Sequence, residues 1–288
     1  MDKSLQNLQQ FSNFYIDFHE KIFNTHVKCM QHLFAAIPFQ KFNKIDIAEK
    51  IKHRQPILNP QQLIIEEKDL EQLFDFVYPV VKQYLHLRKK EVSRLGELND
   101  KRKFSLKELL IALINKDTQT FDNFSKKLAV PSLLLEMITE LISAPYFELV
   151  AEFFSKKLSK FQWCEPFCPI CGGIPSMAQI NEQTGLKILW CRRCNNPWTF
   201  TDKICPHCMN SEIKSQSFIF LTNFKPYRIE ACNKCNNYLK TIDNLIQFNQ
   251  VNFSVVNIAT YYLDLLAKNY GYQLNNYVRF YFDQQQFS

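Results

Sequence analysis

Four Cys-x-x-Cys pairs between residues 168 and 235 constrain the fold of this chain more than any other feature of its sequence. Two cysteines separated by two residues can direct both sulfur atoms into the mouth of one tight turn. Two such turns complete a tetrahedron of thiolates around a metal ion. Eight cysteines in four pairs therefore predict two metal sites with four sulfur ligands each.

The spacing of the pairs predicts which of them share a metal ion. Nineteen residues separate the first pair from the second, and 23 separate the third from the fourth, which suits two zinc-ribbon modules. Interleaved pairing, first with third and second with fourth, is the alternative. The predicted ligands are Cys168, Cys171, Cys191 and Cys194 for one site, and Cys205, Cys208, Cys232 and Cys235 for the other.

Sulfur-only tetrahedral sites select zinc or iron, and the sequence leaves both metals open. Either metal can be structural, because a four-thiolate zinc site contributes roughly 10–16 kcal/mol of apparent binding energy; a redox or regulatory metal is the alternative. Pro169 and Gly172 suit a tight turn, since proline presets φ and glycine tolerates positive φ. Met209 replaces that glycine after the third pair, so a less regular turn is expected there.

Composition and length favour a cytoplasmic protein with two ordinary domains. The chain has 288 residues, 46% of them apolar, and it contains no run of about 18 apolar residues that would span a membrane. It begins with a polar stretch and not with the apolar segment of a secretory signal. In a reducing compartment, paired cysteines are metal ligands more often than disulfides.

The N-terminal half carries a helical pattern. Apolar residues recur at helical spacing over 8–23 and again over 70–95, where Pro79 is expected to kink or break the helix. Ser105 followed by Glu108 predicts the start of another helix. Pro131 predicts one more start, and Pro145 is expected to interrupt that helix. Residues 53–62 read as a loop, and residues 1–162 as an all-α domain with one long kinked helix.

From Pro166 the pattern changes to short strands between the cysteine pairs. The order is cysteine turn, strand, hairpin turn, strand and cysteine turn, and it occurs twice with a repeat of about 37 residues. The hairpin turns are expected at 181–185 and 223–226. The predicted fold class is α+β, with a helical domain, tandem rubredoxin-like or zinc-ribbon modules at 163–203 and 204–246, and a tail at 247–288. In the tail, 251–259 have strand character and 261–270 helical character, and we expect it to pack on the ribbons.

Other candidate groups are weaker. Cys164 lies four residues before the first pair, Cys29 sits between two histidines on a predicted helix, and His207 lies inside the third cysteine turn. We interpret Cys164 and Cys29 as incidental and His207 as unnecessary for the second site. The sequence contains no serine triad, glycine-rich phosphate loop or HExxH motif, so we predict no catalytic residues and no enzyme activity.

Charged and aromatic residues around the cysteine pairs form a candidate partner-binding surface. A net charge of +7 allows nucleic acid as a partner, and protein binding or a merely solvated face are the alternatives. The candidates are Arg192, Arg193, Trp198, Arg228, Glu230, Tyr238 and Lys240.

Between residues 166 and 272 the chain contains a series of distinctive strings: Cys168-Pro-Ile-Cys171-Gly172, Leu189-Trp190-Cys191-Arg-Arg-Cys194, Trp198, Cys205-Pro-His-Cys208 and Arg228-Ile-Glu230-Ala-Cys232-Asn-Lys-Cys235-Asn-Asn-Tyr238-Leu239-Lys240. With these residues the region resembles the formate dehydrogenase accessory protein FdhE family. That resemblance implies a cytoplasmic maturation factor that acts as a chaperone, binds the catalytic subunit of a formate dehydrogenase before export and is needed for its activity. It favours iron in rubredoxin-like sites. Independently of the resemblance, we expect no membrane insertion, we disfavour nucleic acid as a partner, and we leave a homodimer open. The alternatives are a nucleic-acid-binding double zinc ribbon and a rubredoxin-like electron carrier.

Overall fold

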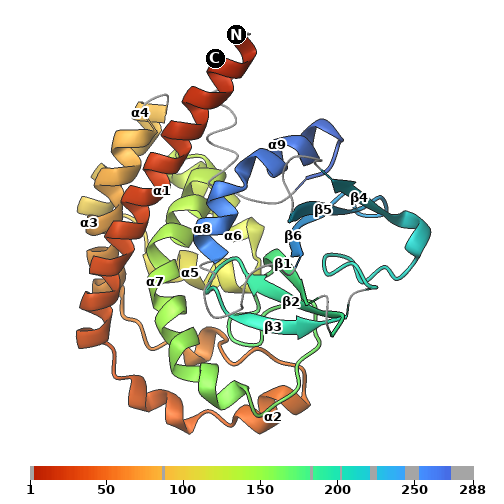
Figure 1. Ribbon diagram of the computed structural model, residues 1–288. Coiled ribbons are helices and arrows are strands. Elements are labelled where there is room, and N and C mark those ends of the chain that lie inside the picture. Colours follow the sequence, from red (N-terminus) through yellow and green to blue (C-terminus); the bar gives the residue numbers. More distant parts are fainter. Residues whose placement is uncertain are drawn as a thin grey trace. The chain divides into compact units, whose positions relative to one another are not determined.

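The structure, a computed structural model, describes residues 3–85, 88–181, 184–201, 203–220, 226–243 and 253–273 (Figure 1). Contacts divide these residues between two units. The first unit contains residues up to Lys41 and Pro60–Leu149; the second contains Phe42–Asn59 and the residues from Val150 onward. The predicted division at 162, 203 and 246 stays a prediction.

Helices build the first unit, as the apolar periodicity indicates. The long helix α1 lies alongside α3 and buries Phe18, Ile22 and Leu33 along one face (Figure 1). This spacing of four and eleven residues keeps the three side chains on one side of a helix. The helices are α1 (Lys3–Ala36), α3 (Glu67–Tyr84), α4 (Lys89–Asp100), α5 (Leu106–Asn115), α6 (Thr118–Leu128) and α7 (Ser132–Leu158), which continues into the second unit.

The predicted helix starts are confirmed, but neither proline ends its helix: the predicted interruption at Pro145 is wrong, and of the kink or break predicted at Pro79 the break is absent. Ser105 caps α5, with its hydroxyl oxygen accepting a hydrogen bond from the backbone N–H of Glu108 at 3.1 Å. Helix α7 begins directly after Pro131. However, Pro79 lies inside α3, and Pro145 lies inside α7.

His26 explains how α7 accommodates its proline. Pro145 has no N–H, so it cannot donate to the carbonyl of Leu141, four residues earlier. His26 of α1 supplies the missing donor, because its Nε2 lies 2.8 Å from the Leu141 carbonyl oxygen. Burial lowers the pKa of His26 to about 4, so the ring is neutral near pH 7. The interior proline therefore leaves no buried carbonyl unpaired at this position.

This arrangement predicts a pH-dependent stability. The pKa of His26 rises from about 4 in the folded chain towards the ordinary 6.5 on unfolding, so the unfolded state binds more protons between these values. The free energy of unfolding should fall by about 3 kcal/mol as pH drops from 6.5 to 4. His26→Gln, which can donate but not titrate, should flatten that dependence in urea titrations followed by circular dichroism. An unchanged pH slope in this variant, relative to an exposed-site control such as His53→Gln, would contradict the assignment.

One continuous six-stranded sheet forms the centre of the second unit. Its strand order is β3-β2-β1-β6-β5-β4, so each ribbon contributes three adjacent strands. All neighbours are antiparallel except β1 and β6, which are parallel and join the two ribbons. The strands are β1 (Pro175–Asn181), β2 (Leu186–Cys191), β3 (Pro197–Phe200), β4 (Gln216–Phe220), β5 (Tyr227–Cys232) and β6 (Tyr238–Asp243).

The sheet confirms the repeated pairs of strands and adds a third strand to each repeat. β1 with β2, and β4 with β5, are the predicted hairpins; β3 and β6 were not predicted. Gly185 closes the first hairpin with φ +67°, and its N–H donates to the Asn181 carbonyl at 2.7 Å. Residues 182–183 of this turn and 223–225 of the second predicted turn lie outside the described residues.

The tail forms two helices that cover one face of the sheet (Figure 1). In α9 (Tyr261–Asn269), as predicted, Leu263 and Ala267 pack against the sheet. The strand predicted at 251–259 is wrong, because Phe253–Ala259 form helix α8, while Val251 and residues 274–288 lie outside the described part. The β-branched residues there favour a strand locally, but the helix allows Val256 to pack on the sheet's apolar cluster.

A further segment of the second unit precedes the ribbons in sequence. The predicted loop runs from helix α2 (Ile47–Lys52) to the short 3-10 helix Pro60–Gln62. The backbone N–H groups of Ile57 and Leu58 donate to the carbonyls of Pro169 and Ile170, each at 2.8 Å. The loop thereby braces the first cysteine turn. Among the described residues, no single helix is both long and apolar enough to cross a membrane; α6 and α7 meet that test only together, across a sharp bend.

Candidate metal centres

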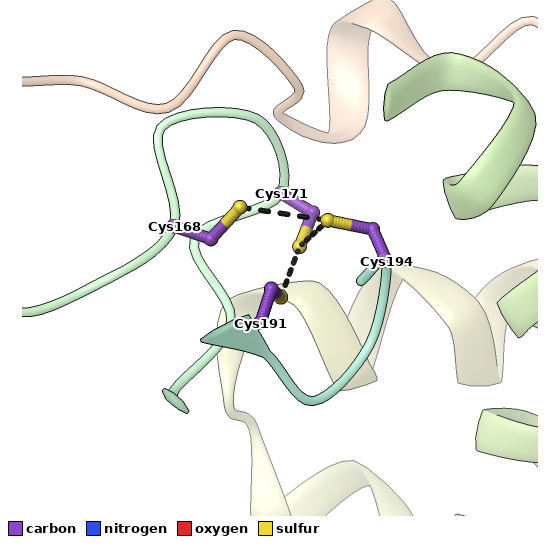
Figure 2. A group of neighbouring side chains, drawn as sticks. All are labelled: Cys168, Cys171, Cys191 and Cys194. Carbon is purple, nitrogen blue, oxygen red and sulfur yellow. Dashed lines mark hydrogen bonds between the residues drawn. The ribbon is translucent and has the colours of Figure 1, made fainter. Parts of the chain in front are cut away.

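The first cysteine cluster has the geometry of a four-thiolate site. Its sulfur atoms point towards one another (Figure 2), with Sγ–Sγ distances of 3.5 Å for Cys168–Cys194, 3.4 Å for Cys171–Cys191 and 3.6 Å for Cys171–Cys194. A tetrahedron with metal–sulfur bonds of about 2.3 Å has edges of about 3.8 Å. The cluster is therefore slightly smaller than, and close to, the size that zinc or iron needs.

The second cluster has the same arrangement. Its Sγ–Sγ distances are 3.9 Å for Cys205–Cys235 and 3.7 Å for Cys208–Cys232. Within each cluster, all four sulfur atoms lie within 4.8 Å of one another. The structure thus brings together the two predicted groups of cysteines, and it does not show the interleaved pairing.

The turns that hold these cysteines share one backbone conformation. The residue after each pair has a left-handed φ, between +55° and +66°. In the first turn, the N–H of Gly172 donates to the Cys168 carbonyl at 3.0 Å; in the third, the N–H of Met209 donates to the Cys205 carbonyl at 2.9 Å. The turn at Met209 is therefore regular, contrary to expectation, although a non-glycine residue in this conformation costs roughly 1–2 kcal/mol. The four residues are Gly172, Asn195, Met209 and Asn236.

Backbone N–H groups in the first site are directed at sulfur. The N–H of Ile170 lies 3.4 Å from Cys168 Sγ, and the N–H of Arg193 lies 3.4 Å from Cys191 Sγ. The Arg193 guanidinium donates to the Cys171 carbonyl at 3.1 Å, which places a positive charge beside the cluster. Such donors stabilise thiolates, the form in which cysteine binds metal.

Burial and neighbouring groups oppose each other in setting the thiol pKa values. Burial raises the pKa of Cys168 and of Cys194 well above the ordinary value. At Cys171, burial also acts to raise the pKa, but hydrogen bonds from the other three thiols and the Arg193 charge outweigh it and lower the pKa. A bound zinc or iron ion would deprotonate all four thiols. The donor set, the sulfur spacing and the N–H donors all fit such an ion.

The two clusters differ in exposure. All four cysteines of the first cluster are buried, whereas Cys208 of the second is exposed and Cys235 half-buried. Beside the second cluster lies a cavity of about 20 Å³, lined in part by Cys205, Cys232 and His207. That volume holds about one water molecule. The second site is therefore the one that solvent can approach.

The remaining candidate groups lie outside both clusters. Cys164 is exposed, and His207 donates a hydrogen bond from its Nε2 to the Tyr238 carbonyl oxygen at 3.1 Å. Cys29 is buried in α1, where burial raises its thiol pKa to about 12. A thiol with so high a pKa carries almost no reactive thiolate near pH 7.

Several predicted partner-binding residues are buried in the second unit. Trp198, Tyr238 and Lys240 are 5%, 2% and 1% exposed. The indole of Trp198 donates to the Glu165 carbonyl at 3.0 Å, which ties β3 to the segment before the first cysteine turn. Trp198, Tyr238 and Lys240 thus offer a partner little surface in this conformation. Arg192 and Arg193 are half-buried, and a binding role for them stays a prediction.

The other two candidates, Arg228 and Glu230, belong to a largely buried charge network, and a binding role for them stays a prediction. Glu230 accepts hydrogen bonds from Lys187 at 2.5 Å and from Arg228 at 2.9 Å, and Arg228 also pairs with Asp243. Lys187 is 2% exposed, and it links β2 of the first ribbon to β5 of the second. Sequence reasoning missed Lys187 and Asp243. The available signal was a lysine within the apolar alternation of 186–190.

Comparisons with known proteins show that this chain is similar in sequence and in fold to proteins named FdhE. No family model matches the chain. A relative named Protein FdhE homolog from Aquifex aeolicus is 30% identical over 133 residues, 44% of this chain and 46% of the relative. The Proteus mirabilis homologue is 28% identical over 182 residues, 62% of this chain and 55% of the relative. The chain thus spans about half the length of these relatives.

A solved structure shares the fold. The crystal structure of the FdhE protein from Pseudomonas aeruginosa matches with a TM-score of 0.54 and 17% sequence identity. The likeness covers 91% of this chain and 93% of that one. A helical region followed by a sheet region with two four-cysteine clusters and C-terminal helices is therefore an architecture with a solved precedent.

Proposed function

Because the chain belongs to the FdhE family, we propose that it is an accessory protein for a formate dehydrogenase. In this role it binds the catalytic subunit of that enzyme in the cytoplasm, before export, and is needed for the enzyme's activity. The match to the FdhE homologue of Aquifex aeolicus, 30% identical over 133 residues, carries the proposal. The function is that of a binding protein and not of an enzyme.

The cysteine clusters would each hold one zinc or iron ion in this function. In the first site the four buried cysteines and the braced turn favour a structural ion, since all four sulfur ligands are shielded from solvent. Four thiolates around a divalent ion carry a net charge of −2. Arg193 beside the first cluster reduces the cost of burying that charge.

A rubredoxin-like electron carrier is the second candidate function. The exposure of Cys208 favours it, because a metal at the second site would lie near the surface where electrons can be exchanged. It requires iron with a reversible Fe(III)/Fe(II) couple. Protein made with ample iron under anaerobic conditions that holds only zinc, without thiolate-to-iron absorption bands, would eliminate this function and leave the accessory role intact.

Deleting the gene for this chain is expected to lower formate dehydrogenase activity at least tenfold in the cells that carry it, and a plasmid copy should restore the activity. The reason is that a catalytic subunit without its accessory protein does not mature. An affinity-tagged chain should also co-purify the catalytic subunit, measured by mass spectrometry. Unchanged enzyme activity after deletion, together with no catalytic subunit in the purified fraction, would contradict the proposed function.

A further inference from the structure

The second unit repeats one three-stranded arrangement, and the two copies are joined in the same orientation. In the first ribbon, the outer edge of β1 is occupied by β6, which runs parallel to it. The two copies are joined by parallel strand pairing between residues 177–180 of β1 and residues 240–243 of β6. The first strand of a ribbon can therefore bind a parallel extended segment along its outer edge, as β1 binds β6.

The register identifies the equivalent edge in the second ribbon. Cys191 pairs with Pro175 in the first hairpin, and Cys232 pairs with Gln216 in the second. Counting from these pairs, and allowing for the bulge between Pro175 and Met177, residues 217–220 of β4 correspond to 177–180 of β1. These are the same four positions that β6 covers in the first ribbon.

No strand in the described part of the chain covers the corresponding edge of β4. β4 is the last strand of the sheet, with no neighbour beyond it among the described strands. Phe218 and Phe220 are 49% and 64% exposed, whereas the corresponding residues of β1 are less exposed: Ala178 is fully buried and Ile180 is half-buried. Phe218 and Phe220 share one face, because side chains alternate along a strand. An exposed strand edge with two apolar aromatic residues is a site for strand addition.

We propose that the edge of β4 at residues 217–220 binds an extended segment of a partner protein as an added strand parallel to β4. Backbone hydrogen bonds hold the segment, and apolar side chains at alternate positions contact Phe218 and Phe220. The identity of the partner, the catalytic subunit, rests on the proposed function. The site and the binding mode rest on the repeat alone.

A second copy of this chain fits the edge less well. A five-residue strand is about 17 Å long and neighbouring strands lie about 5 Å apart, so the contact covers far less than the roughly 800 Å² per partner of a stable complex. Pairing β4 of one copy with β3 of another, as the repeat pairs β1 with β6, would also continue without closure into open chains. A short segment of a client needs neither a large area nor closure.

Phe220→Lys is the variant that tests the edge. Lysine on an edge strand opposes strand addition, and the position is 64% exposed, so the fold should be kept. Leu186→Lys is the matched control, because Leu186 is also an exposed apolar residue, 49% exposed, but belongs to the interior strand β2. The probe is a set of overlapping synthetic peptides that covers the formate dehydrogenase catalytic subunit, measured by fluorescence anisotropy with the full chain.

We expect at least one peptide to bind, with affinity at least tenfold weaker for Phe220→Lys and unchanged for Leu186→Lys, and with slower hydrogen exchange at 217–220. The absence of any binding peptide, or equal affinity of both variants, would overturn the edge site. Sedimentation that shows a dimer of the wild type, lost in Phe220→Lys, would overturn it in favour of a second copy.

Co-purification of the whole catalytic subunit separates the edge site from the proposed function. If Phe220→Lys retains the subunit as well as the wild type does, only the edge site is refuted. If the wild type retains no subunit, the proposed function is refuted.

Discussion

Replacing Cys171 with serine is expected to remove the metal from the first site and to unfold the second unit. Cys171 is 2% exposed, and its sulfur lies 3.4 and 3.6 Å from those of Cys191 and Cys194. A serine hydroxyl does not replace a thiolate ligand for zinc or iron. Apparent binding energies of structural zinc sites, roughly 10–16 kcal/mol, are as large as the whole stability of a typical domain, about 5–15 kcal/mol.

The measurement combines metal content with tryptophan fluorescence. All three tryptophans of the chain lie in the second unit and are at most 9% exposed: Trp163, Trp190 and Trp198. Unfolding of this unit should therefore shift their emission to longer wavelength while the helical circular dichroism of the first unit remains. A variant that keeps two metal ions per chain and native emission would refute the structural role of the first site.

Two matched cysteine variants separate loss of a ligand from loss of any thiol. Cys208→Ser should release the metal of the second site but leave the emission of Trp190 and Trp198 native, because Cys208 is exposed and its cluster is less enclosed. Cys164→Ser should change neither metal content nor emission, since Cys164 lies outside both clusters. If all three substitutions lowered the metal content and shifted the emission equally, the difference in burial between Cys171, Cys208 and Cys164 would have no energetic consequence.

The cysteine clusters could be predicted from sequence because their geometry is local. Two residues between cysteines determine a turn, and the requirement for four ligands then joins turns that are 19 or 23 residues apart. The merging of the two ribbons could not be predicted in this way. It depends on β1 and β6, whose pairing joins Met177 to Lys240 and has no counterpart in the spacing of motifs.

The burial of individual polar side chains was harder to predict than the cysteine clusters. Tyr238 and Lys240 carry polar atoms, and such residues are usually at least partly exposed, which led to their interpretation as a binding surface. The structure buries them because Asp264, more than twenty residues later, completes their hydrogen bonds. Likewise Pro145 was expected to break a helix, since no local pattern announces that His26 would supply the missing donor.

Asp264→Ala is expected to destabilise the second unit by about 3–5 kcal/mol, the cost of breaking a buried ion pair on one side. Asp264 accepts from the Tyr238 hydroxyl at 2.7 Å and from Lys240 Nζ at 2.9 Å. Both partners of the ion pair are buried, with side chains 1% and 6% exposed. Without the carboxylate, the Lys240 ammonium would still donate to the Asn257 carbonyl at 2.6 Å, but it would lose the charge of Asp264 that faces it in the interior.

The double variant Asp264→Leu with Lys240→Met distinguishes an unpaired charge from a loss of packing. Replacing both charges by apolar side chains of similar size is often neutral or stabilising, so most of the lost stability should return. Urea unfolding followed by tryptophan emission measures both variants against the wild type. If Asp264→Ala lowers the free energy of unfolding by less than about 1 kcal/mol, the Lys240–Asp264 pair contributes no more than a solvent-exposed ion pair. If the double variant is as unstable as the single one, the Tyr238 hydrogen bond and the shape of the side chains, and not the buried charge, hold α9 on the sheet.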